Sequence, residues 1–263
     1  MNLKSTILLF CLFIYLNNIF SQCFKENTTF QIGEKLSMEI YYNWGFVWVN
    51  AGYVYFKVDS ANYKNSNCYK FTSYGRTYNN WDWFYKVRDL YTSYIYQEKL
   101  QTAFFSRKVF EGGNVIHNKY IFDYTKNKIY ADLYCTDDGE RKDTVDILSC
   151  LYDPLTAIYY ARNIDFSNAE INQKFPIKII LDNAIFNIYK RYLGKEKITD
   201  RNNKDYSCIK FKAKMVKGTI FDGGEDLTVW VTDDKNKVPV LVKAKILVGS
   251  IKAYLSEADG LRY

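Results

Sequence analysis

Regular alternation of apolar and polar residues is the feature that most constrains how this chain can fold. From Leu36 to Tyr42 the apolar side chains fall at every second position. The same period recurs from Ser207 to Met215, where lysines alternate with residues such as Ile209 and Phe211. Successive side chains of a strand point to opposite faces, so this period is typical of half-buried β-strands. We therefore expect a mainly β protein, built as a curved antiparallel sheet, an open half-barrel or a sandwich.

Segments with the same strand character follow along the whole chain. They are 46–58, 68–77, 83–96, 104–110, 115–124, 128–134, 175–181, 185–193, 227–232, 238–247 and 250–255. The Ala51-Gly52 step predicts a bend or bulge in the first of them. Glu111-Gly112-Gly113-Asn114 and Asp137-Asp138-Gly139 predict hairpin turns, because glycine accepts a positive φ.

One segment departs from the strand pattern. Asp153 is a good helix N-cap, and Pro154 suits the first helical position because that position needs no backbone donor. Apolar residues then follow at helical spacing towards Asn163, which predicts one short helix over about 153–163. The chain has only three prolines and no linker rich in Pro, Gly or Ser. We expect residues 22–263 to form a single domain.

The N-terminus has the pattern of a secretory signal. Lys4 precedes an apolar run from Ile7 to Ile19, and Ser21 offers a small residue before Gln22. This pattern predicts export to the periplasm or cell envelope with cleavage after Ser21, leaving residues 1–21 as signal peptide. An uncleaved membrane anchor is the alternative. No later stretch is continuously apolar over about 20 residues, so we expect no transmembrane segment in the mature chain.

The chain is basic, with a formal charge of +7. This charge permits attraction to acidic glycans or anionic head groups, although lysines spread along a chain also serve plain solubility. If two of the predicted strands are neighbours, their alternating lysines form a basic stripe; the alternative is an ordinary charged face. These lysines are Lys210, Lys212, Lys214, Lys243 and Lys245. No nucleic-acid-binding motif is present, so a nucleic-acid partner is not expected.

An odd number of cysteines would remain after cleavage. They are Cys23, Cys68, Cys135, Cys150 and Cys208. At least one thiol is then unpaired or joined to another molecule. Cys23 raises the question of lipidation, but Gln22 stands where lipoprotein signals carry a small residue. Cys68 and Cys208 lie on predicted strands, where buried free thiols are the simplest expectation.

The sequence contains no recognisable catalytic or metal-binding signature. His117 is the only histidine and follows a predicted turn, so a surface position is expected. Asp82 and Asp89 lie among aromatic residues, as carboxylates of sugar-cleaving sites do, but such aspartates also cap turns. Four aspartates between 137 and 146 lack the spacing of a calcium loop and suit a solvated turn. We expect no catalytic residue, cofactor or metal ion.

Aromatic residues are unusually frequent, with 25 tyrosines, 18 phenylalanines and five tryptophans. Most of them are expected to pack across strands. A sheet with a single short helix can leave part of a concave apolar face open, which suits a lipid-like ligand or a glycan. The candidate ligand-binding residues are Trp44, Trp48, Trp81, Trp83 and Tyr85. The alternatives are a site for another envelope protein at a sheet edge or lysine-rich face, and a polysaccharide-binding or polysaccharide-cleaving site.

Several short motifs, in order, resemble those of a bacterial exported family, the domain of unknown function 3108. They are Gly33-Glu34-Lys35-Leu36, Trp44, Ala51-Gly52, the helix from Asp153 to Arg162, Val229-Trp230-Val231-Thr232-Asp233-Asp234, Val238-Pro239-Val240 and Gly249 to Leu255. The resemblance covers about residues 30–256 and implies an envelope protein of mostly antiparallel sheet, similar in fold to open half-barrels that carry acyl chains. It implies no known activity and no catalytic residues.

Overall fold

The protein folds into one highly curved antiparallel sheet of 14 strands, in the order β8-β7-β6-β5-β4-β3-β2-β1-β14-β13-β12-β11-β10-β9. The computed structural model describes residues 26–44, 46–216, 223–246 and 249–263. The predicted signal segment and Cys23 lie outside these residues. Within them, no helix has the length and apolar character needed to cross a bilayer.

Most strands pair with their neighbours in sequence, and the two halves of the chain meet where β1 pairs with β14. The first half contains β1 (Lys35–Trp44), β2 (Val47–Tyr63), β3 (Ser66–Thr77), the 3-10 helix η1 (Asn79–Trp81), β4 (Arg88–Tyr96), β5 (Gln101–Glu111), β6 (Asn114–Asp123), β7 (Lys128–Cys135) and β8 (Gly139–Asp146). Helix α2 (Pro154–Arg162) follows, and then β9 (Lys174–Leu181), β10 (Ala184–Thr199), β11 (Asp205–Met215), β12 (Gly224–Thr232), β13 (Pro239–Lys245) and β14 (Ser250–Asp259).

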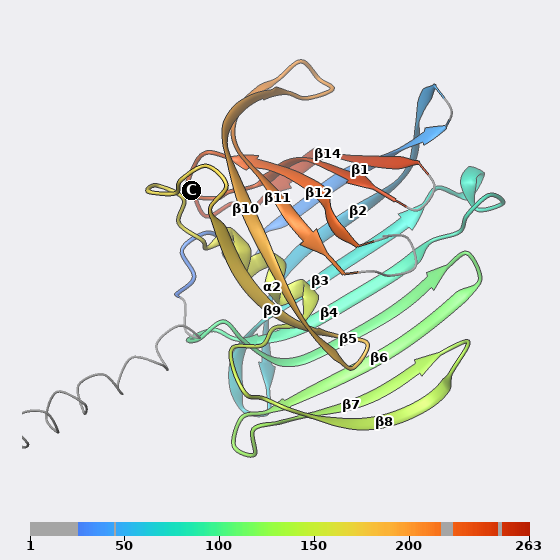
Figure 1. The fold of residues 1–263 in the computed structure, drawn as a ribbon, viewed down its shortest axis with the longest axis vertical. Helices are drawn as coiled ribbons and strands as arrows, with labels where there is room; N and C mark the ends of the chain where they lie inside the picture. Colours follow the sequence, from blue (N-terminus) through green and yellow to red (C-terminus); the bar gives the residue numbers. More distant parts are fainter. Residues whose placement is uncertain (1–25, 45, 217–222, 247–248) are drawn as a thin grey trace, which may run out of the picture.

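The sheet curls without closing into a barrel. Strands β8 and β9 are its two edges, and β9 and β10 cross the inner face of the first half, with α2 between the layers (Figure 1). Tyr152 adds a single parallel bridge to Ile179 at the β9 edge. The predicted fold class is confirmed: mainly β and open, with one short α-helix among the described residues.

Helix α2 forms where the capping residues predicted it. The Asp153 carboxylate accepts hydrogen bonds from the backbone amides of Leu155 and Thr156, both at 3.0 Å. It also accepts from the hydroxyls of Ser93 and Thr102, both at 2.7 Å, and from the Thr156 hydroxyl. The cap therefore also anchors the helix to β4 and to the start of β5.

The helix covers the apolar part of the inner face. Tyr159 stacks on Phe71 with ring centroids 3.8 Å apart, and Phe30 meets the Tyr159 ring edge-on at 5.0 Å. Phe105 and Tyr120, both fully buried, extend this core across β5 and β6. The concave apolar face that the sequence suggested for a ligand is thus filled here by the chain's own aromatic side chains.

Most local predictions are borne out. Gly112 and Gly113 take positive φ values in the β5–β6 turn, and the β1–β2 register shifts at Ala51, as a bulge requires. The predicted strand over 83–96 begins too early. Residues after Trp81 instead turn back on η1, because Phe84 and Tyr85 donate their backbone N–H groups to the Trp81 carbonyl.

The two ends of the curled sheet differ. We call the end covered by α2 the closed end; there Glu34, next to β1, lies against Arg162. At the opposite end, which we call the open rim, lie the start of β2, the 78–87 loop and the turns at 112–113 and 136–138. Alternate turns of an antiparallel meander fall at the same end of the sheet, which is why segments so far apart in sequence share this rim.

Candidate functional site

Exposed apolar side chains gather at one corner of the open rim. We use the term aromatic corner for Phe46, Val47, Trp48, Trp81, Trp83, Phe84 and Tyr85. Phe46, Val47, Trp83 and Phe84 expose 105%, 61%, 74% and 47% of their surface. Contiguous exposed apolar groups are uncommon on monomeric soluble proteins and mark surfaces that bind something.

Specific contacts hold the two segments of the corner together. The Trp81 indole N–H donates to the Asn50 carbonyl on β2 at 2.9 Å. The Tyr78 amide donates to the Ala51 carbonyl at the same distance, and the rings of Tyr42 and Phe84 lie 6.1 Å apart. The 78–87 loop is therefore fixed against the β1–β2 hairpin.

The loop has its own internal support. The Asp82 carboxylate accepts hydrogen bonds from the Thr77 hydroxyl at 2.7 Å and from the Arg88 guanidinium at 2.5 Å. These bonds, with Arg88 the larger influence, lower the pKa of Asp82. Asp82 therefore closes the loop as a turn-stabilising carboxylate and leaves Trp83 pointing outward.

Four of the five sequence-predicted site residues belong to the two segments of this corner rather than to the concave face. Trp48, Trp81, Trp83 and Tyr85 all lie there, although they come from two separate segments. Trp83 is exposed, whereas the Trp48 ring is partly covered by the Lys252 ammonium at 3.9 Å. Trp44 ends β1 opposite Val47, and its side chain lies outside the described part of the structure.

Tyr85 connects the corner to the interior. A β-carbon added at Gly112 would lie 2.3 Å from the Tyr85 ring, so only glycine permits this approach at a φ of +58°. Burial raises the pKa of Tyr85, and the nearby carboxyl groups of Glu111 and Asp89 raise it further. The Tyr85 ring thus lies above two buried acids.

Those acids, Asp89 on β4 and Glu111 on β5, form a hydrogen-bonded carboxyl pair. Glu111 exposes only 6% of its surface. Burial, followed by the charge of Glu111, raises the pKa of Asp89 to about 8. Two carboxylates this close cannot both ionise easily, so the pair retains one shared proton at neutral pH.

An arginine lies next to the carboxyl pair on the same inner face. Arg107 exposes 6% of its surface and forms an ion pair with Asp182, whose carboxylate also accepts from Asn118 at 3.1 Å. The Tyr91 hydroxyl interacts with the same guanidinium. The Arg107 Nε–H, however, is buried without a hydrogen-bond partner. The inner face near the open rim therefore buries polar side chains, and not all of their hydrogen-bonding groups have a partner.

The structure pairs Asp89 with Glu111 and not with Asp82, whose partners are Thr77 and Arg88. Glycoside hydrolysis needs two carboxyl groups about 5–10 Å apart, with room for a sugar carbon or water between them. A directly hydrogen-bonded pair leaves no such room. The geometry therefore does not favour the sugar-cleaving alternative.

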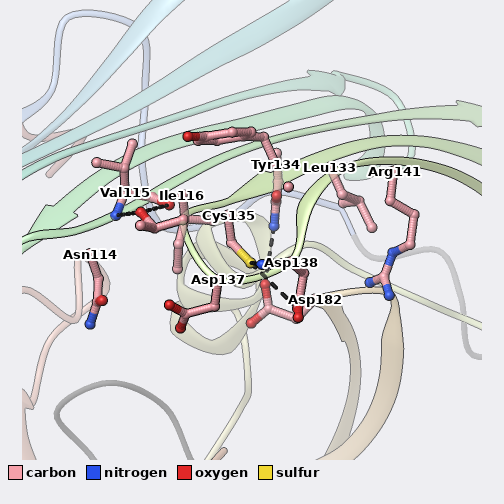
Figure 2. Close-up of a pocket in the computed structure, with 13 residues that line it drawn as sticks. Asn114, Val115, Ile116, Leu133, Tyr134, Cys135, Asp137, Asp138, Arg141 and Asp182 are labelled. Atoms are coloured by element: carbon pink, nitrogen blue, oxygen red, sulfur yellow. Dashed lines mark hydrogen bonds between the residues drawn. The ribbon is translucent and has the colours of Figure 1, made fainter.

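A pocket of about 300 Å³ with a mixed polar and apolar lining opens beside this cluster (Figure 2). Its polar and charged lining side chains are Asn114, Asn118, Tyr134, Cys135, Thr136, Asp137, Asp138, Arg141 and Asp182. Arg141 is the only cationic residue in this lining. No described group of His, Cys, Asp and Glu residues has a geometry suited to a metal ion. Asp137 and Asp138 lie in a solvent-exposed turn, as the sequence suggested, whereas Asp143 and Asp146, expected in the same turn, lie on β8.

Sequence reasoning missed Glu111, Arg107 and Asp182. Glu111 appeared only as part of a predicted turn, and neither Arg107 nor Asp182 belongs to a motif. Their contacts with Asp89, Tyr91 and Asn118 depend on strand register and on β9–β10 crossing the inner face. No local sequence pattern specifies the strand register or the crossing of these two strands. His117, in contrast, lies exposed on β6 as expected, and Cys68 and Cys208 are buried free thiols.

Comparison with a solved structure supports the fold. A β-barrel-like protein of the domain of unknown function DUF1849 from Brucella abortus matches with a TM-score of 0.55 and 7% sequence identity. The match covers 89% of this chain and 100% of the other. At this identity the likeness concerns the fold alone. No functionally curated protein matches the chain.

The family resemblance rests on much more of the chain than its individual motifs. Residues 37–256 match the family described as protein of unknown function, DUF3108. This span runs from β1 into β14 and includes the aromatic corner, the carboxyl pair and helix α2. The chain therefore belongs to the DUF3108 family.

Proposed function

We propose that this protein is an exported, non-enzymatic binding protein that holds an amphipathic, lipid-like ligand at the aromatic corner. The observation that carries the proposal is the exposure of Phe46, Val47, Trp83 and Phe84 on two segments of the chain, which contacts at Asn50, Ala51 and Tyr42 hold against each other. Burying such side chains releases about 25 cal/mol per Å² of apolar surface. Tryptophan rings also suit the boundary between an apolar and an aqueous phase.

The filled interior supports the corner as the binding surface. Helix α2 and Phe30 cover the apolar inner face, and the inner face near the open rim is polar, with Asp89, Arg107 and Glu111. An acyl chain placed there would remove hydrogen-bond partners from these groups and provide no others. Burying polar groups without such partners costs free energy. The corner instead offers apolar contact without buried charge.

The test uses the mature chain and vesicles of equimolar phosphatidylcholine and phosphatidylglycerol. Vesicle co-sedimentation and the blue shift of tryptophan fluorescence measure binding. We expect wild-type protein to bind, and the double variant Trp83→Ala, Phe84→Ser to lose at least about tenfold in affinity, because about 1.4 kcal/mol of apolar burial is removed.

The matched control removes two exposed apolar side chains far from the corner, with Leu148→Ser and Ile171→Ser. These residues expose 88% and 60% of their surface, and the control should bind like wild type. Native mass spectrometry of protein purified from envelope extracts should in addition show a retained lipid. Equal binding by the corner variant and the control would overturn the proposal.

Export is tested separately by the N-terminus of the protein recovered from the envelope fraction. Cleavage after Ser21 predicts a mature chain that begins at Gln22. A chain that retains Met1 and remains in the cytoplasmic fraction would remove this part of the proposal.

A further inference from the structure

Lysines on the outer face of the sheet face one another directly across a strand pair. Lys243 on β13 is opposite Lys252 on β14, and the same cross-strand row continues through Thr228 to Lys212 on β11. The sequence left open whether the lysine-bearing strands are neighbours. They are not, because β12 lies between β11 and β13. Register nevertheless aligns Lys212, Lys243 and Lys252 on one face.

Aromatic rings contact these cations. The Lys252 ammonium lies 3.9 Å from the centre of the Trp48 ring, and the Lys243 ammonium lies 5.0 Å from that of Trp230. Arg201, at the tip of the β10–β11 hairpin, stacks on Tyr41 at 4.2 Å. We call Lys243, Lys252, Arg201, Trp48, Trp230 and Tyr41 the cation–aromatic row. Cation–aromatic contacts of this kind hold the charged groups in place without neutralising them.

The three cations of the row have no ion-pair partner in the described part of the chain. The nearby Glu196 pairs with Lys210, and Glu39 accepts hydrogen bonds from Tyr41 and Asn50. Burial lowers the pKa of Lys252, and Lys243 and Arg201 lower it further. Like charges opposite one another destabilise a sheet. A bound anion would reduce the repulsion between these cations and so stabilise this part of the sheet.

The row adjoins the aromatic corner. Trp48 belongs to both, and it follows the exposed Phe46 and Val47 by one or two positions along β2. Strand register places Trp48 and Lys252 on one face of the sheet, and Val47 and Tyr42, which Phe84 contacts, on the other. A bilayer that meets the rim edge-on can therefore reach the apolar side chains of the corner and the ammonium groups of the row at the same time. This is the arrangement of proteins that lie on a bilayer, with rings at head-group depth and cations at the phosphate level.

We propose that the ligand of the aromatic corner is the surface of an anionic bilayer, whose phosphate groups are bound by Lys243, Lys252 and Arg201. This inference rests on the proposed function and names the head-group chemistry of the same site. An ordinary charged face would interleave lysines with carboxylates, as Lys35 and Glu257 do on β1 and β14. In the row, the nearby carboxylates Glu196 and Glu39 accept from the Trp230 and Tyr41 rings instead, and neither forms an ion pair with the three cations.

The experiment compares vesicles of phosphatidylcholine alone with vesicles of equimolar phosphatidylcholine and phosphatidylglycerol, at low and high NaCl. Wild-type protein should bind the anionic vesicles more tightly, and salt should reduce the difference. Each lysine near an anionic surface contributes about fivefold in affinity. Lys243→Gln with Lys252→Gln should therefore reduce binding to anionic vesicles about twentyfold, and Lys243→Glu with Lys252→Glu should reduce it further.

The matched control is Lys108→Gln with Lys119→Gln. Both lysines are exposed on β5 and β6 and lack an ion-pair partner among the described residues. The control changes the net charge equally, so it should retain the preference for anionic vesicles. If both pairs of substitutions reduce binding equally, the effect is one of net charge and the assignment to the row is wrong.

Two further outcomes separate this inference from the proposed function. In the first, wild-type protein binds both vesicle types equally and the Trp83→Ala, Phe84→Ser variant binds neither. The corner then binds lipid, but the inference of an anionic head group fails. If wild-type protein binds neither vesicle, both proposals fail. Competition by soluble glycerol phosphate at concentrations far below those that screen charge would assign the row to a free anion and overturn the bilayer as ligand.

Discussion

The closed end and the open rim both bury charged groups, but the two ends differ in how completely these groups are paired. At the closed end Glu34 is fully buried, and the Arg162 guanidinium donates to both of its oxygens at 2.5 and 2.9 Å. Arg162 also donates to the Asn236 carbonyl at 2.8 Å. One anion meets one cation with its donors used, which is the arrangement a buried ion pair requires.

At the open rim the buried charged groups do not form a one-to-one ion pair. Asp89 and Glu111 share a proton, and the buried Arg107 is paired with the more exposed Asp182 while its Nε–H has no partner. Trp83 and Phe84 are exposed on the adjoining 78–87 loop. The comparison indicates that stability comes from the closed end, whereas the rim retains unfavourable features of the kind found at binding sites. Four sets of variants test this contrast.

The largest effect should come from breaking the closed-end ion pair. Arg162→Met leaves the buried Glu34 carboxylate without a cation, and we expect a loss of about 3–5 kcal/mol in the free energy of unfolding, measured by urea denaturation. Glu34→Leu added to Arg162→Met should recover much of this loss, because the unpaired buried carboxylate is then removed as well. A single variant as stable as wild type would show that the closed end does not carry the stability assigned to it.

Loss of the helix cap should rank second. Asp153→Ala removes the acceptor for two backbone amides and three hydroxyls, with an expected cost of about 3 kcal/mol. Asp153→Asn keeps one acceptor oxygen and should lose about half as much. Loss of near-ultraviolet circular dichroism at lower urea concentration than in wild type would measure the effect, and equal losses for the two variants would argue against the capping role.

The carboxyl pair predicts an unusual pH dependence. The pKa of Asp89 is about 8 in the folded protein, above the ordinary value of 3.8, so the folded state binds more protons than the unfolded state between these values. Raising the pH therefore favours unfolding, by up to about 1.4 kcal/mol per pH unit. Asn at position 89 imitates the protonated acid.

The measurement is the difference in unfolding free energy between Asp89→Asn and wild type, from about pH 5 to about pH 8. We expect the variant to gain stability relative to wild type as pH rises, because only wild type must give up the shared proton. Taking the difference cancels the other titrating groups. A constant difference over this range would mean that Asp89 and Glu111 do not share a proton.

The smallest effect on stability should come from the aromatic corner. Trp83→Ala with Phe84→Ser removes two exposed side chains, so the free energy of unfolding should change by less than about 0.5 kcal/mol. The same variant is expected to lose lipid binding. A large loss of stability instead would place these rings in the fold rather than in the binding surface.

The sequence predicted those features that depend on neighbouring residues. Asp153 and Pro154 located helix α2, because a cap and a first-turn proline are local signals. Gly112 and Gly113 located a turn for the same reason. The loop 83–87 was mistaken for strand because its aromatic residues favour strands. The side-chain contacts that close it, from Asp82 to Thr77 and Arg88, leave no mark on the pattern of apolar and polar residues.

The candidate site was predicted only in part. The sequence singled out Trp48, Trp81, Trp83 and Tyr85 by residue type, but their meeting at one corner depends on Trp81 bonding to Asn50 across 31 residues. It gave no indication that Asp89 lies beside Glu111, or that Lys243 lies opposite Lys252. These are consequences of strand pairing.

The sequence by itself determined the class of this protein: alternating strands, one capped helix and an abundance of rings, because backbone geometry makes side-chain period and capping readable over a few residues. Tertiary structure alone decided which rings fill the core and which remain exposed, and which charges are neutralised. Register and curvature bring distant residues together, and a shift of one residue would move every side chain to the opposite face.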